Sequence, residues 1–404
     1  MPAPLRRPAV VPVRRLVATV YGYWFLNDLV LLYPVYALFF VDTGLSVAQI
    51  SSLFGCWVLP GLVLELPSGV WADAVSRRLL LVLGPLLTAL GFLLWMLAPG
   101  YWAFAVGFLL WGTSGALRSG ALEALVYEEL DRVGAADRYA TVAGRSTSLS
   151  MFAAMVAMAA AGPVLAYGGF LAVGLGSVVT ALGSAWLGWL LPEHRRPTGP
   201  RRAEPARGRY LTVLRAGLAE ARRDRRVRRT LLLIPAVGAI WGAVEEYVPL
   251  LAVENGAAAT QVPLLILLVQ GGAAAGGLLV GYGSRWRSGV LAGTLAGGAV
   301  VLGVGGVSGS WAGLVLVALA FGGFHLVTGV EEARLQELVG GESRATVTSL
   351  AGLGTSVAIA AVYGVYAAAS TVAGHGWIFA LFGCCYLLVA LVLGWTGRRG
   401  ARTP

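Results

Sequence analysis

Five ionisable side chains lie deep inside long apolar stretches of the sequence, where charge is otherwise rare: Asp28, Arg118, Glu245, Glu246 and His325. An ionisable group near the centre of a bilayer costs about 2.5–3.5 kcal/mol on insertion scales, so such groups persist where they pair or face a wet cavity. A carboxylate beside a permanent cation can be neutralised by a proton or displaced by a ligand. That exchange would couple the binding of the proton to the binding of the ligand, so these residues are the candidate functional residues.

The strongest candidate for such a pair involves Arg118, which cannot lose its proton and therefore needs a counter-charge or water. Asp28, preceded by Asn27, is the predicted partner, and Glu123 is the alternative. A buried ion pair that only fixes helix packing is the competing interpretation of Arg118.

Glu245 and Glu246 are neighbours, so on a helix their side chains point about 100° apart and cannot share a face. When the prolines of the two corresponding apolar stretches are aligned, Glu246 falls three residues beyond the position that matches Asp28. Three residues keep a side chain on roughly the same face, so Glu246 is the predicted cavity-facing acid. His325 is a candidate for a proton relay, and hydrogen-bonded packing is the alternative.

The surroundings of these residues are those of a membrane protein. The hydrophobic fraction is 57% and the charged fraction is 12%, against about 25% charged residues in soluble domains. Stretches such as 79–98 and 288–306 are long enough to span a bilayer core, which takes about 20 residues. They are continuous and do not alternate, so helices must satisfy the backbone within lipid. The sequence therefore predicts an all-α polytopic membrane protein.

The arginines predict how the spans are oriented. We expect twelve spans, at 16–41, 48–70, 79–98, 101–127, 140–166, 170–191, 230–253, 262–283, 288–306, 311–335, 345–370 and 376–397. All basic residues are arginine, and none falls in the odd-numbered connections. This asymmetry predicts cytoplasmic termini and a multi-pass protein of the cell (cytoplasmic) membrane, in a bacterium its inner membrane. The net charge of +10 therefore reflects membrane topology, and no nucleic-acid partner is expected.

Two halves of six spans each are predicted, at 1–191 and 230–404, joined by a basic cytoplasmic linker at 192–229. From Arg209 onward, leucines at helical spacing among arginines indicate an amphipathic helix on the inner leaflet. A solvated linker is the alternative. An internal repeat supports the division, because Glu123 and Glu128 have counterparts at Glu332 and Glu337.

Two short motifs carry a family resemblance. The connection GVWADAVSRRL (69–79) resembles the loop signature of the major facilitator superfamily, with Ala74 and Ser76 as departures from it. The matching residues are Gly69, Asp73, Arg77 and Arg78. In the fifth span, Gly162-Pro163 partly matches a motif that is typical of the drug:proton antiporters of this family.

The resemblance implies two six-helix bundles that alternate access to a central cavity, with both termini in the cytoplasm. It also implies that the first and fourth spans of each half line this cavity, which places nearly all the deep charge there. In the family the loop latches the halves together in the outward-facing state. We assign that role to Asp73 and Arg77, with Glu123 or Glu128 as partner. Plain anchoring by arginines is the alternative.

The expected function is secondary active transport driven by protons, with efflux of a small amphipathic or drug-like molecule. A nutrient or metabolite uptake carrier is the alternative, and a non-transporting membrane sensor or membrane enzyme is a third class. We expect no enzyme, since no nucleophile–base pair or Walker motif occurs, and no cofactor. The three cysteines fall within spans and indicate neither disulfides nor a metal site. The expected partners are the substrate, protons and the bilayer, and the expected state is a monomer.

Overall fold

The structure is a computed structural model that describes residues 13–74, 76–194, 225–339 and 341–400. The described residues form helices joined by short turns, and they contain no strand. This confirms the predicted all-α class. The predicted amphipathic helix that begins at Arg209 lies outside the described residues.

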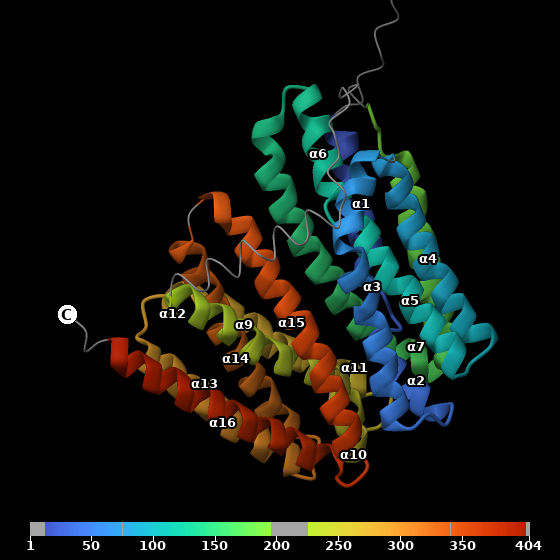
Figure 1. The fold of residues 1–404 in the computed structure, drawn as a ribbon. Coiled ribbons are helices and arrows are strands. Elements are labelled where there is room, and N and C mark those ends of the chain that lie inside the picture. Colours follow the sequence, from blue (N-terminus) through green and yellow to red (C-terminus); the bar gives the residue numbers. More distant parts are fainter. Residues whose placement is uncertain (1–12, 75, 195–224, 340, 401–404) are drawn as a thin grey trace, which may run out of the picture.

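The helices form an N-terminal and a C-terminal group (Figure 1). The first group comprises α1 (Val13–Asp28), α2 (Tyr36–Asp42), α3 (Val47–Ala74), α4 (Arg77–Leu97), α5 (Tyr101–Arg118), α6 (Ala121–Arg132), η1 (Ala136–Arg138) and α7 (Tyr139–Leu190). The second comprises α9 (Arg225–Val244), η2 (Glu245–Tyr247), α10 (Val248–Glu254), α11 (Val262–Leu278), α12 (Val280–Gly283), α13 (Ser288–Val307), α14 (Gly313–Leu338), α15 (Gly341–Ala369) and α16 (His375–Gly400).

All twelve predicted spans are helical, although several are broken. Eight segments of the described chain are long and apolar enough to cross a membrane. The longest of these contains α7, which holds two spans and bends at Gly169, where φ is 62°. The first span is divided into α1 and α2, and the fourth into α5 and α6 at Gly120, where φ is 75°. Glycine adopts such positive φ values without the penalty of a Cβ.

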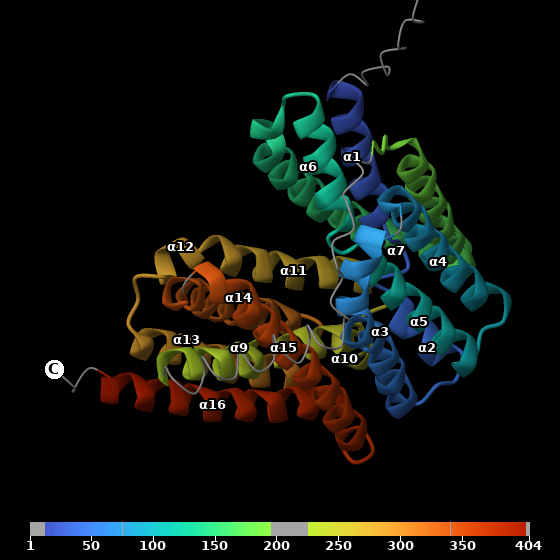
Figure 2. The same cartoon turned by 45° about the horizontal axis from the view of Figure 1, so that its top comes forward.

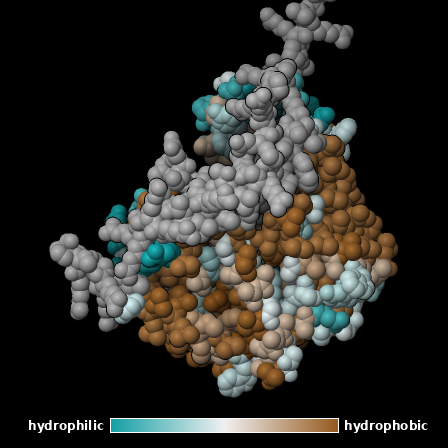
Figure 3. All heavy atoms as spheres, in the orientation of Figure 1, coloured by the Kyte–Doolittle hydropathy of each residue, from teal (hydrophilic) through white to brown (hydrophobic). Residues whose placement is uncertain are grey.

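The surface is apolar over broad areas, as expected for contact with acyl chains. Large hydrophobic side chains such as Trp102, Leu319 and Leu388 are 78%, 63% and 65% exposed. Figure 3 shows hydrophobic residues over much of the visible face, with hydrophilic residues at its top and left and in a smaller area at the lower right.

The two groups of helices pack against each other through α3 with α15 and α7 with α11. We call the ends that bear the arginine-free connections the outer ends. Between described residues, every hydrogen bond that joins the groups lies near the outer ends. Both Figure 1 and Figure 2 show the groups meeting near α2 and α10 and diverging away from them. The inner ends of the groups are therefore apart.

Candidate functional site

The acid predicted to face the cavity, Glu246, lies where the two groups meet. It is 8% exposed and belongs to the short 3₁₀ turn η2, which interrupts the seventh span. The hydroxyl of Tyr36, at the start of α2, donates a hydrogen bond to its Oε2. The break between α1 and α2 turns Tyr36 toward the other half. Each partner of this hydrogen bond is therefore positioned by an irregular stretch of its own half: Tyr36 by this break and Glu246 by η2.

Glu245 is partly exposed and binds different partners. The Tyr33 hydroxyl donates to its Oε1 at 3.3 Å, and Nε2 of Gln270 on α11 donates to the same oxygen. The two acids thus point to different neighbours, as expected, but both reach the first span. Our prediction singled out Glu246 and missed that Glu245 also bridges the halves. Both acids reach the first span because Tyr33 and Tyr36, about one helical turn apart, each present a hydroxyl donor: Tyr33 to Glu245 and Tyr36 to Glu246.

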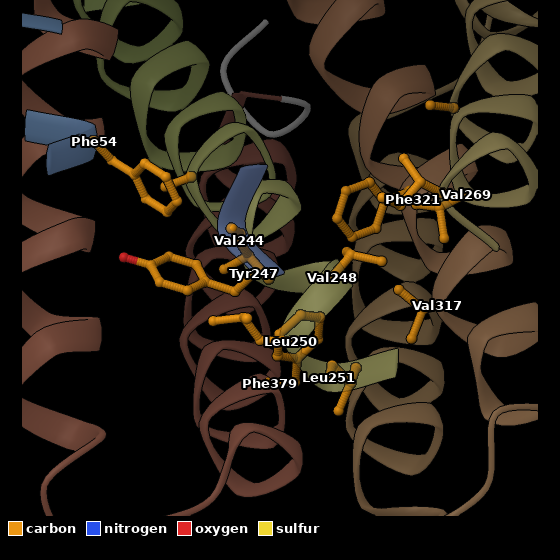
Figure 4. Packing of buried hydrophobic residues seen from close by; sticks show 14 of the residues in the cluster. Phe54, Val244, Tyr247, Val248, Leu250, Leu251, Val269, Val317, Phe321 and Phe379 are labelled. Atoms are coloured by element: carbon orange, nitrogen blue, oxygen red, sulfur yellow. The ribbon is translucent and has the colours of Figure 1, made fainter. Parts of the chain in front are cut away.

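Aromatic rings surround this contact and shield it. The Tyr36 ring packs within 5.6–6.5 Å, centroid to centroid, of Phe40, Phe54, Trp95, Phe108 and Trp111. From the other half, Tyr247 packs edge-on against Phe54 at 5.3 Å and donates to Ser51 Oγ at 2.7 Å. Figure 4 shows the Tyr247 ring reaching toward Phe54 beside the packed side chains of α10. The outer ends are thus closed by a mainly aromatic layer with a few buried hydrogen bonds.

The predicted ion pair between Asp28 and Arg118 is not formed. Asp28, at the end of α1, accepts hydrogen bonds from Asn27 Nδ2 at 3.0 Å and from the Ser150 hydroxyl on α7. Arg118 is the last residue of α5, and its Nε donates weakly to Ser114 O at 3.4 Å. Its aliphatic stem lies over Gly84 of α4, where an added Cβ would be 3.0 Å from Cγ. The chain breaks just after Arg118, so this side chain folds back on α4.

The alternative partner of Arg118, Glu123, is an exposed residue in the first turn of α6 and forms no ion pair with another described residue. It instead lines a cavity of about 160 Å³ between α1, α6 and α7.

His325 lies on α14 with its ring 3.8 Å, centroid to centroid, from that of Trp241 on α9. Trp241 Nε1 donates to Thr328 Oγ1 at 3.2 Å. Nε2 of His325 is buried without a hydrogen-bond partner among the described residues. The predicted relay through His325 is therefore not connected to a carboxylate of the described chain in this conformation.

Contacts of three residues at the end of the predicted cytoplasmic latch, Ser76, Arg77 and Arg78, lie among the described residues. Arg77 Nη1 lies 2.7 Å from Glu128 Oε2, whereas Glu123 does not pair with it. Glu193, just after α7, accepts from the Arg77 backbone N–H at 2.8 Å and from the Ser76 hydroxyl. Arg78 lies over the Trp189 ring at 5.3 Å. These contacts hold the connection within the N-terminal half, and the side-chain surroundings of Gly69 and Asp73 lie outside the described residues.

A second acid in the same region, Glu129, was missed by the sequence analysis. It is 3% exposed and accepts from Arg132 Nε at 3.1 Å and from the His194 backbone N–H at 2.7 Å. It therefore ties α6 to the end of the half. Glu128 and Glu129 are adjacent acids, and nothing in the sequence around them indicates which of the two is buried.

Gly162, in the predicted fifth-span motif with Pro163, lies in close contact with the other half. A Cβ on Gly162 would clash with the backbone oxygen of Thr260, in the turn before α11. Only a glycine lets the two backbones approach in this way.

Two polar residues of the site were also not predicted. Gln270 is a lone polar side chain in an apolar stretch of α11, which is a signal that the sequence offered. Ser150 sits in a serine-rich stretch, where no spacing distinguishes it from its neighbours. No group of three or more His, Cys, Asp or Glu in the described ranges could hold a metal ion.

Comparison with known proteins decides the family. A sequence profile described as Major Facilitator Superfamily matches residues 25–363. The chain belongs to the major facilitator superfamily. A search of curated protein sequences finds no match.

Solved structures of several transporters share the fold of this superfamily chain. A mutant of the nucleoside transporter NupG superposes with a TM-score of 0.76 at 12% identity, over 94% of this chain and 98% of that one. A D-xylose-proton symporter gives 0.64 at 17% identity, over 94% and 96%. A bacterial homologue of the human lysosomal transporter Spinster gives 0.69 at 14% identity, over 95% and 97%. The family match makes the chain a multi-pass membrane transporter of this superfamily, and these likenesses show that it has the fold of the solved transporters.

Proposed function

We propose that the chain is a proton-coupled antiporter that exports small amphipathic or drug-like molecules across the cytoplasmic membrane. The observation that carries the proposal is the cross-half pair of Glu245 and Glu246 with Tyr33 and Tyr36. No arginine of the described chain forms an ion pair with either acid. The charge of each carboxylate is therefore balanced only by hydrogen-bond donors or by a proton.

The arrangement couples protonation to alternating access. In this conformation the outer ends are joined and the inner ends are apart, which corresponds to an inward-facing state. Opening of the outer ends would separate both acids from the tyrosines and expose them to water. A proton bound or released by the acids then changes the free-energy difference between the two states, as linkage requires. One proton moving down 100 mV supplies about 2.3 kcal/mol.

The aromatic surroundings support an amphipathic substrate. Tyr33, Trp57 and Trp111 pack beside this contact and are only partly buried, so they offer apolar faces next to the two acids. Such a lining binds hydrophobic or cationic molecules through ring faces and burial. Asp28 with Asn27 and Ser150 supplies a second polar position on the first span.

Uptake by symport is the second candidate function. A D-xylose-proton symporter has this fold, and the cluster of Gln270, Tyr33 and Glu245 has the donors and acceptors that a hydroxylated nutrient requires.

Proton movement in proteoliposomes tests the proposal and separates the two functions. With an acidic lumen and a pH-sensitive dye inside, an antiported amphipathic substrate added outside makes the lumen more alkaline. A symported substrate added to liposomes without a gradient makes the lumen more acidic. We expect the first response, and we expect Glu246→Gln to abolish it. Acidification by a sugar or nucleoside would establish uptake, and no response to any tested compound would favour a sensor.

A further inference from the structure

A histidine at the outer end of the C-terminal half is connected to the contact between the halves by a short chain of side chains. His375 is the first residue of α16 and is partly exposed. Its Nδ1 lies 2.7 Å from the hydroxyl of Tyr366 on α15. The Tyr366 ring stacks on the ring of Tyr247, with centroids 3.4 Å apart and planes 6° from parallel. Tyr247 in turn donates to Ser51 of the N-terminal half. One side chain, Tyr366, therefore connects His375 to a residue that joins the outer ends.

A second connection closes this path into a ring. Helix α10 begins directly after Tyr247 and ends at Glu254. The Glu254 carboxylate accepts from the backbone N–H groups of His375 at 2.7 Å and of Gly376 at 3.3 Å. A carboxylate at this position stabilises the start of α16. The backbone of His375 is thereby fixed relative to α10, while its ring lies beside Tyr366.

The direction of the hydrogen bond between Tyr366 and His375 depends on the charge of the histidine. Tyr366 is 0% exposed, and its hydroxyl has no other hydrogen-bond partner among the described residues. The hydroxyl therefore donates to Nδ1 when the ring is neutral and carries its proton on Nε2. In a protonated ring both nitrogens are donors, so Nδ1 no longer accepts. Protonation thus leaves the hydroxyl of a buried tyrosine without an acceptor.

The described groups that titrate beside His375 are Glu254, at the end of α10, and Tyr366. The end of α13 also packs here, since a Cβ on Gly306 would be 2.8 Å from the backbone oxygen of Gly376, but residues 305–307 do not titrate. Glu254 is exposed, so water screens its attraction for a charged histidine. The buried hydrogen bond to Tyr366 is therefore the contact that protonation changes most.

This change favours separation of the outer ends at low pH. A histidine that is released from Tyr366 into water binds a proton more strongly than one whose Nδ1 must accept a hydrogen bond. A lower pH favours the state that binds more protons. Histidine exchanges its proton between about pH 5 and pH 8, which covers the range that the outer surface of a membrane meets.

We propose that His375 is a positioning residue that responds to the pH on the outer side. When it is neutral, it holds Tyr366 against Tyr247 and keeps the outer ends joined. When it is protonated, it releases Tyr366 and the outer ends separate more readily. The inference rests on the exchange between inward-facing and outward-facing states in the proposed function. It does not depend on the substrate or on the direction of transport.

Distances between spin labels at Ser46→Cys and Ala258→Cys, one at the outer end of each half, test the proposal in lipid nanodiscs without substrate. The labelled chain lacks its native cysteines. His375→Asn keeps an acceptor for Tyr366 but does not titrate. From about pH 8 to about pH 5, we expect the open population to rise about tenfold more in the labelled parent chain than in His375→Asn. This difference isolates His375, because every other titrating group is the same in both chains.

Three further variants separate the pH response from a purely structural role. His375→Ala removes the acceptor, so it should raise the open population about tenfold at both pH values. Tyr366→Phe keeps the stacked ring without the hydroxyl, so it should show the same small pH response as His375→Asn. Thr371→Ala is the matched control in the same connection, because the Thr371 hydroxyl donates only to the local backbone oxygen of Ala368. It should respond as the parent chain does.

Equal pH responses of the parent chain and His375→Asn would overturn the proposal, as would unchanged distances in His375→Ala. The proposed antiporter fails separately. A pH response through His375 without any substrate-driven proton movement would contradict the antiporter and leave the positioning role intact. Proton-coupled export by a chain whose outer distances do not respond to pH through His375 would contradict the positioning role and leave the antiporter intact.

Discussion

The Tyr36 hydroxyl donates a hydrogen bond to Glu246 across the boundary between the two halves, 210 positions apart in the chain. One turn earlier, Tyr33 makes the corresponding contact with Glu245. Two tyrosines of the first span therefore hold two neighbouring acids of the seventh. Because these contacts join the outer ends, we propose that they respond to the transport state.

Removal of the Tyr36 hydroxyl should favour opening of the outer ends. In Tyr36→Phe, Glu246 loses its donor while buried, at a cost of about 1–3 kcal/mol in the inward-facing state. The equilibrium should shift toward the outward-facing state by about 5- to 150-fold, since 1.4 kcal/mol corresponds to a factor of ten. Distances between spin labels at Ser46→Cys and Ala258→Cys, in a background without native cysteines, measure this shift.

The matched control is Tyr101→Phe, because the Tyr101 hydroxyl contacts Ser52 within the same half. Its label distances should match those of the unmodified protein. An unchanged distribution in Tyr36→Phe would mean that this hydrogen bond does not stabilise the closed outer ends.

Glu246→Gln should separate transport from proton coupling. The amide oxygen still accepts from Tyr36, but the side chain no longer exchanges a proton. We expect the variant to exchange substrate across liposomes at equal concentrations and to lose accumulation driven by a pH gradient. Asp42→Asn, an exposed acid at the outer end of α2, serves as control. Accumulation by Glu246→Gln at the rate of the unmodified protein would remove this acid from the mechanism.

Asp28 and Arg118 should each be required, but as separate groups. Asp28→Asn and Arg118→Ala are each expected to abolish proton-coupled transport while the purified proteins retain their thermal stability. Since Asp28 is held by Asn27 and Ser150, the exchanged pair Asp28→Arg with Arg118→Asp should not restore transport. Restored transport in the double variant would show that the two do pair in another state.

Gly162→Ala should disturb the contact between the halves. The new methyl group meets the backbone oxygen of Thr260, which cannot move aside without displacing the turn before α11. We expect lower transport and a shift of the outer label distances toward opening. Gly144→Ala on the same helix meets nothing within 4 Å and should have no effect. Equal behaviour of the two variants would rule out close approach as the role of Gly162.

Two adjacent acids of α6 should differ in their contribution to stability. The Glu128 side chain is 54% exposed, so loss of its ion pair with Arg77 in Glu128→Gln should cost at most about 1 kcal/mol. The Glu129 side chain is 4% exposed and binds Arg132 and the His194 backbone, so weakening these charge-assisted hydrogen bonds in Glu129→Gln should cost about 1.5–3 kcal/mol. Thermal unfolding in detergent compares them directly. A larger loss for Glu128→Gln would contradict the assignment of Glu129 as the structural acid.

The sequence by itself determined the class, the number of spans and their orientation. These properties depend on local quantities: the length of each apolar stretch, the need to satisfy backbone groups within it and the placement of arginine between stretches. The motif at Gly69, Asp73, Arg77 and Arg78 likewise identified the family, which the profile match over residues 25–363 established. The sequence also selected the deep acids as candidates, because charge within lipid is costly wherever it occurs.

Only the tertiary structure decided which side chains meet. Asp28 binds Ser150 and not Arg118, and both acids of the seventh span bind tyrosines of the first. The breaks after α1 and α5 set these directions. Pro34 lies in the break between α1 and α2. A proline alone does not predict a helix break, however, because Pro85 lies inside the continuous helix α4.

A side chain selects its partner by distances of a few ångströms between segments that are far apart in the chain. Those distances follow from how the helices pack and bend against one another. Packing depends on the ridges and grooves of both surfaces at once, which no local pattern specifies.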